Sequence, residues 1–404
     1  MTPAVLLACL LAAPPANPVD ALDRRLVAGT AALAWDDAHG RLRAVLAALD
    51  VPVSSQVLVF SRTSLQRTRI GPRTPRAVYF NDELAVGFCQ RGDVLELAAA
   101  DPVEGTSFFT LDQDPDARPR FRRQADDCHA CHATSSNDHR PGHVLRSVWP
   151  DRRGDPVLAR GSARVDPTTP LADRWGGWYV TGTGAGPHRG NRVVGGWPWA
   201  DPADPPPADD VTDLRPFLDV GAYPTGHSDL VALLVFEHQC DALNRMARAA
   251  ATVRQALAEL AELNKLDGQP ADTPWEGITR RIERACEPVV ESLLFVGEVR
   301  LDGPVAGTGD FAREFAARGP AAPDGRSLRQ FDLHARLFRH PVSYLVHGRA
   351  FAGLPKVVRA RVGRRLGEVL DGADRSPKFA HLSAADRRAC REILDATRPG
   401  WRGE

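Results

Sequence analysis

The sequence predicts an α+β fold, with an antiparallel β-rich half at the N-terminal end and an all-helical half at the C-terminal end. Between residues 56 and 111, short runs of branched and aromatic residues alternate with turn-forming residues, a pattern typical of antiparallel strands. From residue 228 onward, apolar residues recur at helical spacing instead. A glycine-rich and then proline-rich stretch over residues 182–210 separates the two halves.

The β-rich half begins with a predicted helix over residues 20–49, in which Gly40 breaks the pattern. The strands that follow are separated by only a few turn-forming residues, so we expect them to pair in chain order as an antiparallel meander. A hairpin and one further strand should come after the meander. The predicted strands are residues 56–60, 77–80, 84–88, 94–97, 106–111, 144–148, 156–160 and 176–181.

The helical half opens at Ser228, a residue type that is favoured as a helix N-cap. An apolar periodicity then runs to about Leu266, shortly before Pro270. The sequence shows no internal repeat, so each later helix is predicted from its own pattern. These helices are expected at residues 278–295, 328–345, 357–370 and 386–397.

The charge balance excludes one class of partner. The chain has 404 residues with 51 basic and 51 acidic side chains, so its formal net charge is zero. Without a basic excess, there is no electrostatic support for binding the phosphate backbone of a nucleic acid. The length is sufficient for two or three domains with buried cores.

The N-terminal residues indicate export. Residues 1–13 form an apolar run that is too short to span a bilayer but fits the core of a signal peptide, which we expect to cover residues 1–18. A lipoprotein signal, in which Cys9 would carry a lipid anchor, is one alternative, and a buried N-terminal helix is another. No other apolar run is long enough to cross a membrane, so we expect a periplasmic or otherwise exported protein without a transmembrane span.

The motif with the clearest chemical meaning is Cys128-His129-Ala130-Cys131-His132, which has the Cys-x-x-Cys-His spacing of a c-type haem attachment site. Two thiols one helical turn apart can bond to the two vinyl groups of a porphyrin, and the adjacent imidazole can ligate its iron. We therefore expect Cys128, Cys131 and His132 to bind one covalently attached haem c, with His132 as the proximal iron ligand. Such attachment takes place outside the cytoplasm, in agreement with the export signal.

Two alternatives explain the same cysteine pair. A structural zinc site would need two further ligands, which His139 and His143 could supply at a short spacing. A thiol-redox site would need the pair at a helix start within a βαβ unit, whereas the sequence predicts a meander. The remaining cysteines are widely scattered, and although export would permit disulfides among them, their spacing assigns no pairs; they are Cys89, Cys240, Cys286 and Cys390.

Four segments besides the haem sequence are characteristic of one group of proteins: Pro72–Asp82, Arg174–Thr183, Glu237–Gln239 and Arg336–Pro341. Through them the chain resembles an uncharacterised family of exported bacterial proteins that contain a cytochrome c domain, over most of residues 55–395. The resemblance implies a c-type haem but no particular reaction or substrate. The strand order before the haem sequence is also similar to that of small β-sheet cytochromes of the c-prime-beta type, in which the haem packs against an antiparallel sheet.

The residue on the other side of the iron separates an electron carrier from an enzyme. Electron-transfer cytochromes c often use methionine, but Met246 lies among charged residues in a predicted helix, so we expect it to be a packing residue. The candidate distal ligands are His238, on an apolar helix face with Asp241 nearby, and His188, in a glycine-rich loop. A structural role is the alternative for both. His143 could cover one haem face or act only locally.

These features predict a c-type haem redox protein, with monohaem electron transfer to a partner protein in the periplasm as the first interpretation. The alternative is a haem enzyme or sensor, of the oxidoreductase class if an enzyme, that acts on peroxide or a nitrogen oxide at an open distal site. Arg174 and Arg189 are candidate hydrogen-bond donors there. The expected regions are a signal peptide at 1–18, a β-rich haem domain at 19–200, a proline-rich linker at 201–226 and a helical domain at 227–404.

Overall fold

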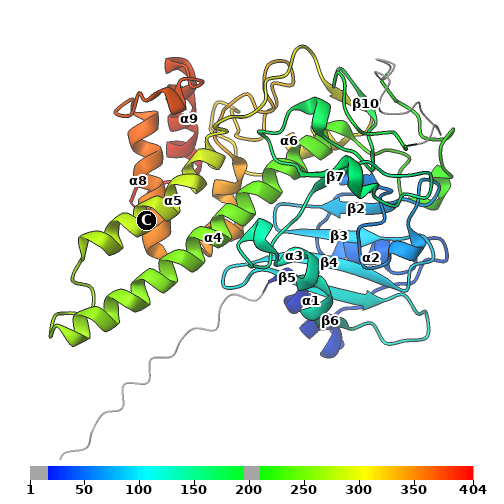
Figure 1. The fold of residues 1–404 in the computed structure, drawn as a ribbon, viewed down its shortest axis with the longest axis horizontal. Coiled ribbons are helices and arrows are strands. Elements are labelled where there is room, and N and C mark those ends of the chain that lie inside the picture. The colour runs from blue at the N-terminus through cyan, green and yellow to red at the C-terminus, as the bar shows by residue number, and fades with distance from the viewer. Residues whose placement is uncertain (1–16, 195–209, 404) are drawn as a thin grey trace, which may run out of the picture.

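The computed structural model describes residues 17–194 and 210–403 and has the predicted α+β fold (Figure 1). Most of the signal-peptide prediction, including Cys9, and residues 201–209 of the linker prediction lie outside the described residues. The first described helix, α1 (Pro18–Val27), begins at the end of that signal prediction with Asn17 as its N-cap. Among the described helices, none combines the length and the apolar character needed to span a bilayer.

The main sheet confirms the antiparallel meander. Six strands pair in chain order, and a seventh strand from later in the chain joins the edge formed by β1. The sequence did not predict β6, because three of its four residues are charged or polar and only Phe121 is of the branched or aromatic type typical of strands. In chain order the strands are β1 (Val57–Val59), β2 (Arg76–Phe80), β3 (Leu84–Phe88), β4 (Val94–Asp101), β5 (Gly105–Asp112), β6 (Phe121–Gln124) and β9 (Trp178–Tyr179).

Two predictions in the N-terminal half are wrong. The helix expected at residues 20–49 is two helices, α1 and α2 (Leu42–Ala48), because the chain turns back at the Asp36–Gly40 bridge, where Gly40 has a φ of +61°. The hairpin expected from 144–148 and 156–160 instead pairs β7 (Arg146–Val148) with β8 (Ser162–Arg164).

The helical half is led by one long helix, α4 (Leu230–Leu266). Its N-cap is Asp229, whose carboxylate accepts hydrogen bonds from the amides of Val231 and Ala232. Ser228, the predicted cap, instead donates to the Tyr179 carbonyl in the sheet. The other described helices are α5 (Glu276–Leu293), α6 (Phe311–Ala316), α7 (Arg349–Ala352), α8 (Lys356–Leu370) and α9 (Ala384–Thr397), and β10 (Gly182–Thr183) pairs with β11 (Ala306–Gly307).

The helix predicted at residues 328–345 does not form. The carboxylate of Asp332 accepts hydrogen bonds from the backbone amides of His334, Ala335 and Arg336, a local arrangement that competes with helical hydrogen bonding. Pro341 would also interrupt such a helix. Only a short 3₁₀ turn forms at the end of this stretch. The apolar residues of this stretch therefore enter the hydrophobic core from an irregular loop.

The two faces of the sheet are buried by different parts of the chain. One face carries Tyr79, Val86 and Leu97 and packs against α1, α2 and the segment that follows residue 210. In that segment, part of the predicted linker, Tyr223 is buried and its hydroxyl donates to the Pro75 carbonyl at 2.7 Å. The other face carries Val78 and packs against the first half of α4.

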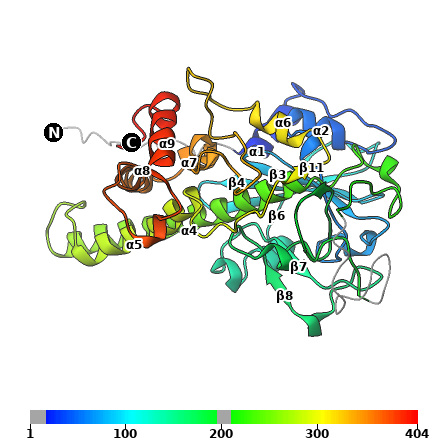
Figure 2. The ribbon, with the colours of Figure 1, turned by 90° about the horizontal axis from the view of Figure 1, so that it is seen from above.

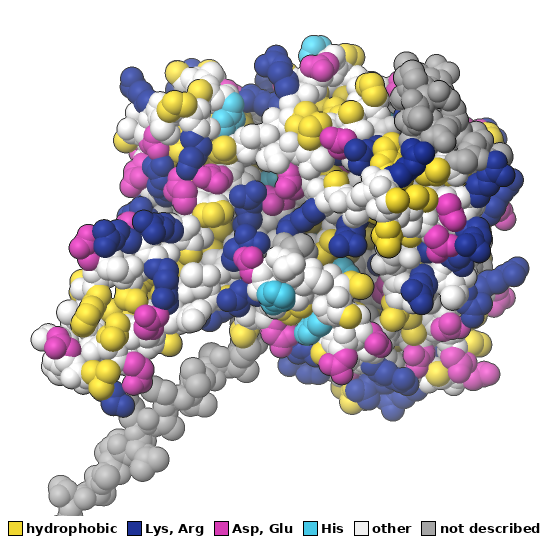
Figure 3. Space-filling view, viewed as in Figure 1, with side chains coloured by type: hydrophobic (Ala, Val, Ile, Leu, Met, Phe, Trp, Pro, Cys, Tyr) yellow, Lys and Arg dark blue, Asp and Glu magenta, His cyan; other side chains and the backbone are white. Residues whose placement is uncertain are grey.

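The second face and the C-terminal helices share one hydrophobic core. Buried residues connect the sheet to α4 and then to α5, α8 and α9 without interruption. Figures 1 and 2 show α4 running from the sheet to the C-terminal helices in both views. On the face that carries α3 (Asp126–His132), acidic and basic side chains are interspersed (Figure 3). The sheet and the helices thus form one packed unit through α4.

A buried ion pair fixes α4 to the segment before β9. Arg174 donates to Glu237 of α4 at 2.6 Å, and the indole of Trp175 donates to the other carboxylate oxygen at 2.6 Å. All three side chains are buried. Two charges so far from water are tolerated only because each remains paired.

We expect Arg174→Ala to destabilise the protein by about 3–5 kcal/mol, because it leaves the Glu237 carboxylate buried without its cation. The measurement is the free energy of unfolding from chemical denaturation. As a control, Arg122→Ala removes an exposed ion pair with Asp112 and should cost less than about 1 kcal/mol. Equal losses in the two variants would show that the buried pair does not hold α4.

Candidate haem site

The Cys-x-x-Cys-His sequence lies on α3, a helix of less than two turns that directly follows β6. Cys128 is half-buried and Cys131 is exposed, and neither forms a disulfide; the other described cysteines are also free. Burial raises the pKa of the Cys128 thiol to about 11. Redox-active pairs of thioredoxin type have a lowered thiol pKa, so this environment does not favour the thiol-redox alternative.

His132 is oriented by a hydrogen bond on one side of its ring. Its Nδ1 lies 2.9 Å from the carbonyl oxygen of Gly142, and because a carbonyl can only accept, Nδ1 carries the proton. The lone pair is then on Nε2, the atom available to a metal, as in most metal-ligating histidines. Burial lowers the pKa of His132, which favours the neutral form that a metal requires.

A cavity of about 570 Å³ lies beside Cys128, Cys131 and His132. A second volume of about 280 Å³ adjoins it, and Cys131 and His132 line both. The larger cavity is within the range of about 300–1,000 Å³ that is typical of small-molecule and cofactor sites. The three residues of the motif are therefore gathered on the wall of a space of suitable size for a cofactor.

The sequence creates this space by placing small residues at the centre of the second face of the sheet. Ala85 of β3 pairs with Ala98 of β4, and Gly87 pairs with Glu96. All of these residues line the larger cavity. The alternate positions on the same strands carry large residues toward the opposite core, so the sheet itself remains well packed.

The sheet side of the cavity carries an ion pair with spare hydrogen-bonding capacity. Arg76 lies 3.2 Å from Glu96, and its guanidinium packs over Gly87, where a Cβ would come within 2.6 Å of the Arg76 Nε and would require the guanidinium to shift. Arg76 Nε and the hydroxyl of Ser64 are buried without a hydrogen-bond partner among the described residues. Both residues line the cavity. Buried polar groups are normally satisfied, so these atoms are suited to a ligand.

His143 lies on the smaller volume and is held through its backbone. Its amide donates to the Asn244 side chain at 2.9 Å, and the Asn244 amide donates back to the His143 carbonyl at 2.8 Å. The imidazole is 7% exposed and its Nε2 has no partner among the described residues. Burial lowers the His143 pKa to about 4, so the ring is neutral. A residue of α4 thus positions the loop that also orients His132.

The candidate distal ligands do not line either volume. His238 lies in the helical core, where its Nε2 is 2.7 Å from the Ser343 hydroxyl and its ring stacks on Phe295. His188 accepts a hydrogen bond from the Gly190 amide and packs against Trp175. Both histidines are therefore held by contacts within the fold, which agrees with the structural role that was the alternative for each.

The other residues considered for the distal side also lie elsewhere. Met246 is buried in the core of α4, as expected of a packing residue. Arg174 is held by Glu237, and Arg189 is paired with Asp173. The polar groups on the cavity, Arg76 and Ser64, were missed: Arg76 lies in the characteristic segment Pro72–Asp82, but that segment indicated no role for it, and no motif marks Ser64. The one available signal was the alternation of large and small residues in β3, which leaves room on one face.

The zinc alternative lacks its ligand set in the part of the chain that the structure describes. Within residues 17–194 and 210–403, no group of three or more His, Cys, Asp and Glu side chains is arranged to hold a metal ion. His139 is exposed and His143 is buried on the cavity wall, so the two do not join the cysteines as one tetrahedral set.

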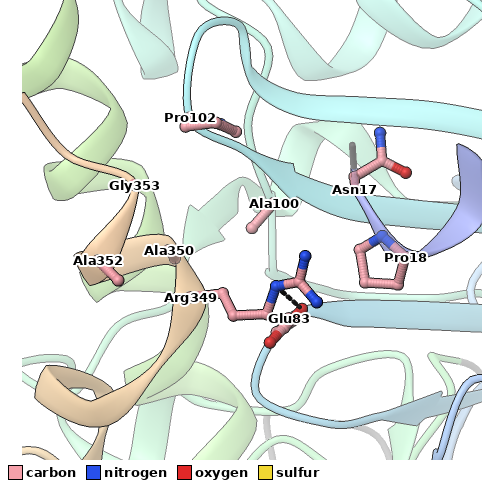
Figure 4. Close-up of a pocket in the computed structure, with 9 residues that line it drawn as sticks. All are labelled: Asn17, Pro18, Glu83, Ala100, Pro102, Arg349, Ala350, Ala352 and Gly353. Carbon is pink, nitrogen blue, oxygen red and sulfur yellow. Dashed lines mark ion pairs between the residues drawn. The ribbon is translucent and has the colours of Figure 1, made fainter. Parts of the chain in front are cut away.

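A separate cavity of about 260 Å³ lies between the start of α1, the end of β4 with the neighbouring β2–β3 and β4–β5 turns, and α7 (Figure 4). Arg349 and Glu83, two of the lining residues, form an ion pair at 3.5 Å. Most of the remaining lining is alanine, proline and glycine, without a thiol or imidazole. This cavity therefore offers no group for tethering or ligating a cofactor.

Comparisons of the chain with protein families, with curated proteins and with solved structures found no match. The resemblance to proteins with a cytochrome c domain stays a prediction. The function must be inferred from the geometry of the residues themselves.

We expect Gly142→Ala to destabilise the protein by about 1–3 kcal/mol, because the new Cβ would lie 2.5 Å from the Asn244 side-chain oxygen. Denaturation measurements test this, and Gly403→Ala is the control because Gly403 also lies outside the helices and its Cβ would meet nothing within 4 Å. In an Asn244→Ala background the cost of Gly142→Ala should shrink. A cost unchanged in that background would contradict the proposed contact.

Proposed function

We propose that the chain binds one haem c through Cys128, Cys131 and His132 and acts as a redox protein outside the cytoplasm. The observation that carries this proposal is the hydrogen bond from His132 Nδ1 to Gly142, which leaves Nε2 for iron beside two free thiols. The adjoining cavity provides space for a porphyrin, and the apolar sheet face provides the surface on which it would pack. A bound haem would supply an iron centre that changes oxidation state and can bind small ligands.

The cavity lining favours a position on the iron that a small molecule can reach. Apart from His132, the only imidazole on the described lining of either volume is that of His143, and no methionine or lysine lines them. His143 directly follows Gly142, which contacts the Nδ1 side of His132, whereas Nε2 points away on the other side of that ring. Ligation by His143 opposite His132 would therefore require the loop to move.

The residues on the sheet side match what such a site needs. Arg76 can donate a hydrogen bond to an oxygen or nitrogen atom of a bound molecule, and Glu96 beside it can accept a proton. These two residues would bind and orient peroxide or a nitrogen oxide, and the surrounding apolar groups would limit access of water. We accordingly place the small-molecule function ahead of pure electron transfer.

Electron transfer remains the second candidate. The specific observation in its favour is the unpartnered, buried Nε2 of His143, because a neutral imidazole without a hydrogen bond is a competent iron ligand. Two axial histidines would give a six-coordinate iron suited to a carrier that passes electrons to a partner protein.

The attachment itself is tested with the protein exported and matured in a host that assembles c-type haem. The wild-type protein should give a pyridine haemochrome spectrum of haem c and a mass equal to the processed chain plus one haem. Cys128→Ala together with Cys131→Ala should abolish covalent attachment, whereas His139→Ala, which changes an exposed residue, should leave it intact. A wild-type mass equal to that of the polypeptide alone would refute the proposal.

The two candidate functions differ in the coordination of the iron. For a small-molecule site, the ferric protein should be high-spin and should bind cyanide, and Arg76→Leu should weaken binding of peroxide by about tenfold through loss of a charged hydrogen bond. Absorption spectra and ligand titrations measure both. For a carrier, the ferric spectrum should be low-spin and insensitive to cyanide, and His143→Ala should convert it to high-spin.

A further inference from the structure

We infer that Arg67 and Arg146 bind the two propionate carboxylates of the haem. This inference rests on the proposed function, because it assigns residues to a group that only haem binding would bring into the cavity. It concerns a part of the site that the Cys-x-x-Cys-His sequence does not specify. This part consists of the residues that would hold the propionate edge of the porphyrin, away from the thioether bonds.

The first observation is the unequal number of charges on the larger cavity. Four arginines and two acidic residues line it. The arginines are Arg62, Arg67, Arg76 and Arg146, and the acidic residues are Glu96 and Asp127. The chain as a whole has equal numbers of basic and acidic residues and therefore no general excess of positive charge. The excess of cations is therefore local to this site.

The second observation is which of these arginines lack a partner. Arg62 pairs with Asp155 at 3.2 Å, and Arg76 pairs with Glu96 at the same distance. Arg67 and Arg146 form no side-chain hydrogen bond or ion pair with any described residue, and both are exposed. The Asp127 carboxylate lies in the first turn of α3, where the helix dipole stabilises it without a cation.

Three other arginines on or next to the sheet do have acidic partners. Arg69 pairs with Asp93, Arg122 with Asp112, and Arg123 with Glu104, all at 3.1 Å or less. Of the four arginines that line the cavity, Arg67 and Arg146 are the two without a carboxylate partner among the described residues. Two guanidinium groups matched to two carboxylates is the charge complement of a haem, and the planar fork of arginine is well suited to a carboxylate.

The positions of the two residues also agree with this role. Arg67 comes from the loop after β1, and Arg146 is the first residue of β7; neither belongs to α3. Arg146 lines both volumes together with Cys131 and His132. The vinyl groups and the propionates occupy different edges of a porphyrin, so the residues that hold the propionates must come from segments other than the one that carries the thiols.

The experiment uses the matured full-length protein and the variants Arg67→Ala, Arg146→Ala and the double variant. Loss of a nearby cation raises the pKa of a carboxyl group, so each single substitution should raise the apparent propionate pKa by about 1 unit, and the double variant by more. The pKa is read from the pH dependence of the haem methyl resonances. The reduction potential should fall at the same time, because removal of a positive charge favours the ferric form.

Arg122→Ala is the control, since it removes an exposed arginine that does not line the cavity. Arg146→Lys keeps the charge and should restore most of the propionate pKa. If maturation of a variant fails, haemin and its dimethyl ester can be bound to the full-length chain carrying Cys128→Ala and Cys131→Ala. Removal of the arginines should then weaken haemin about five- to tenfold per residue and leave the ester unaffected.

The outcomes separate this inference from the proposed function. A propionate pKa that is the same in Arg67→Ala, Arg146→Ala and Arg122→Ala, in a protein that carries haem, would overturn the inference alone. It would indicate that the two arginines face solvent or an acidic partner protein instead. A wild-type protein without haem would overturn the proposed function as well, and the haemochrome spectrum distinguishes the two cases.

Discussion

The hydrogen bond between His132 and the Gly142 carbonyl determines what the candidate site can do. It fixes the tautomer of the imidazole and thereby decides which nitrogen is free. The bond depends in turn on Asn244, which packs so closely on Gly142 that a side chain there would collide with it. A residue of α4, more than one hundred positions away in sequence, thus helps to orient the residue next to the second thiol.

This dependence gives the helical half a structural role at the site. Phe236 of α4 lines the smaller volume and stacks on Phe80 of the sheet at 4.6 Å, and the next residue, Glu237, holds Arg174 in the buried ion pair. The first half of α4 therefore both covers one face of the sheet and forms part of the cavity wall. The later helices stabilise α4 through the shared core.

The parts of the fold that follow from local patterns could be predicted from the sequence. Strands such as Leu84–Phe88 carry their own periodicity, and α4 has both an apolar pattern and residues suited to an N-cap. The stretch after Leu328 has similar apolar content, but the Asp332 side chain favours an irregular loop. The thiols and His132 could also be predicted, because they belong to one short sequence motif. The cavity lining could not, because it is assembled from alternate residues of strands paired across the sheet.

The same pairing explains why the lining bears on function. A carrier of electrons benefits from two protein ligands that hold the iron unchanged between its oxidation states, and such ligands need rigid support on both sides of a porphyrin. Here the rigid support on the sheet side consists of Ala85, Gly87 and Ala98. These residues cannot ligate a metal, and their small size leaves the cavity open. Arg76 and Glu96 stand at the edge of that volume with a donor atom unused. In the haem site that we propose, this sheet would leave space and polar groups on the side where a carrier would need a second ligand, which supports the proposed binding of a small molecule.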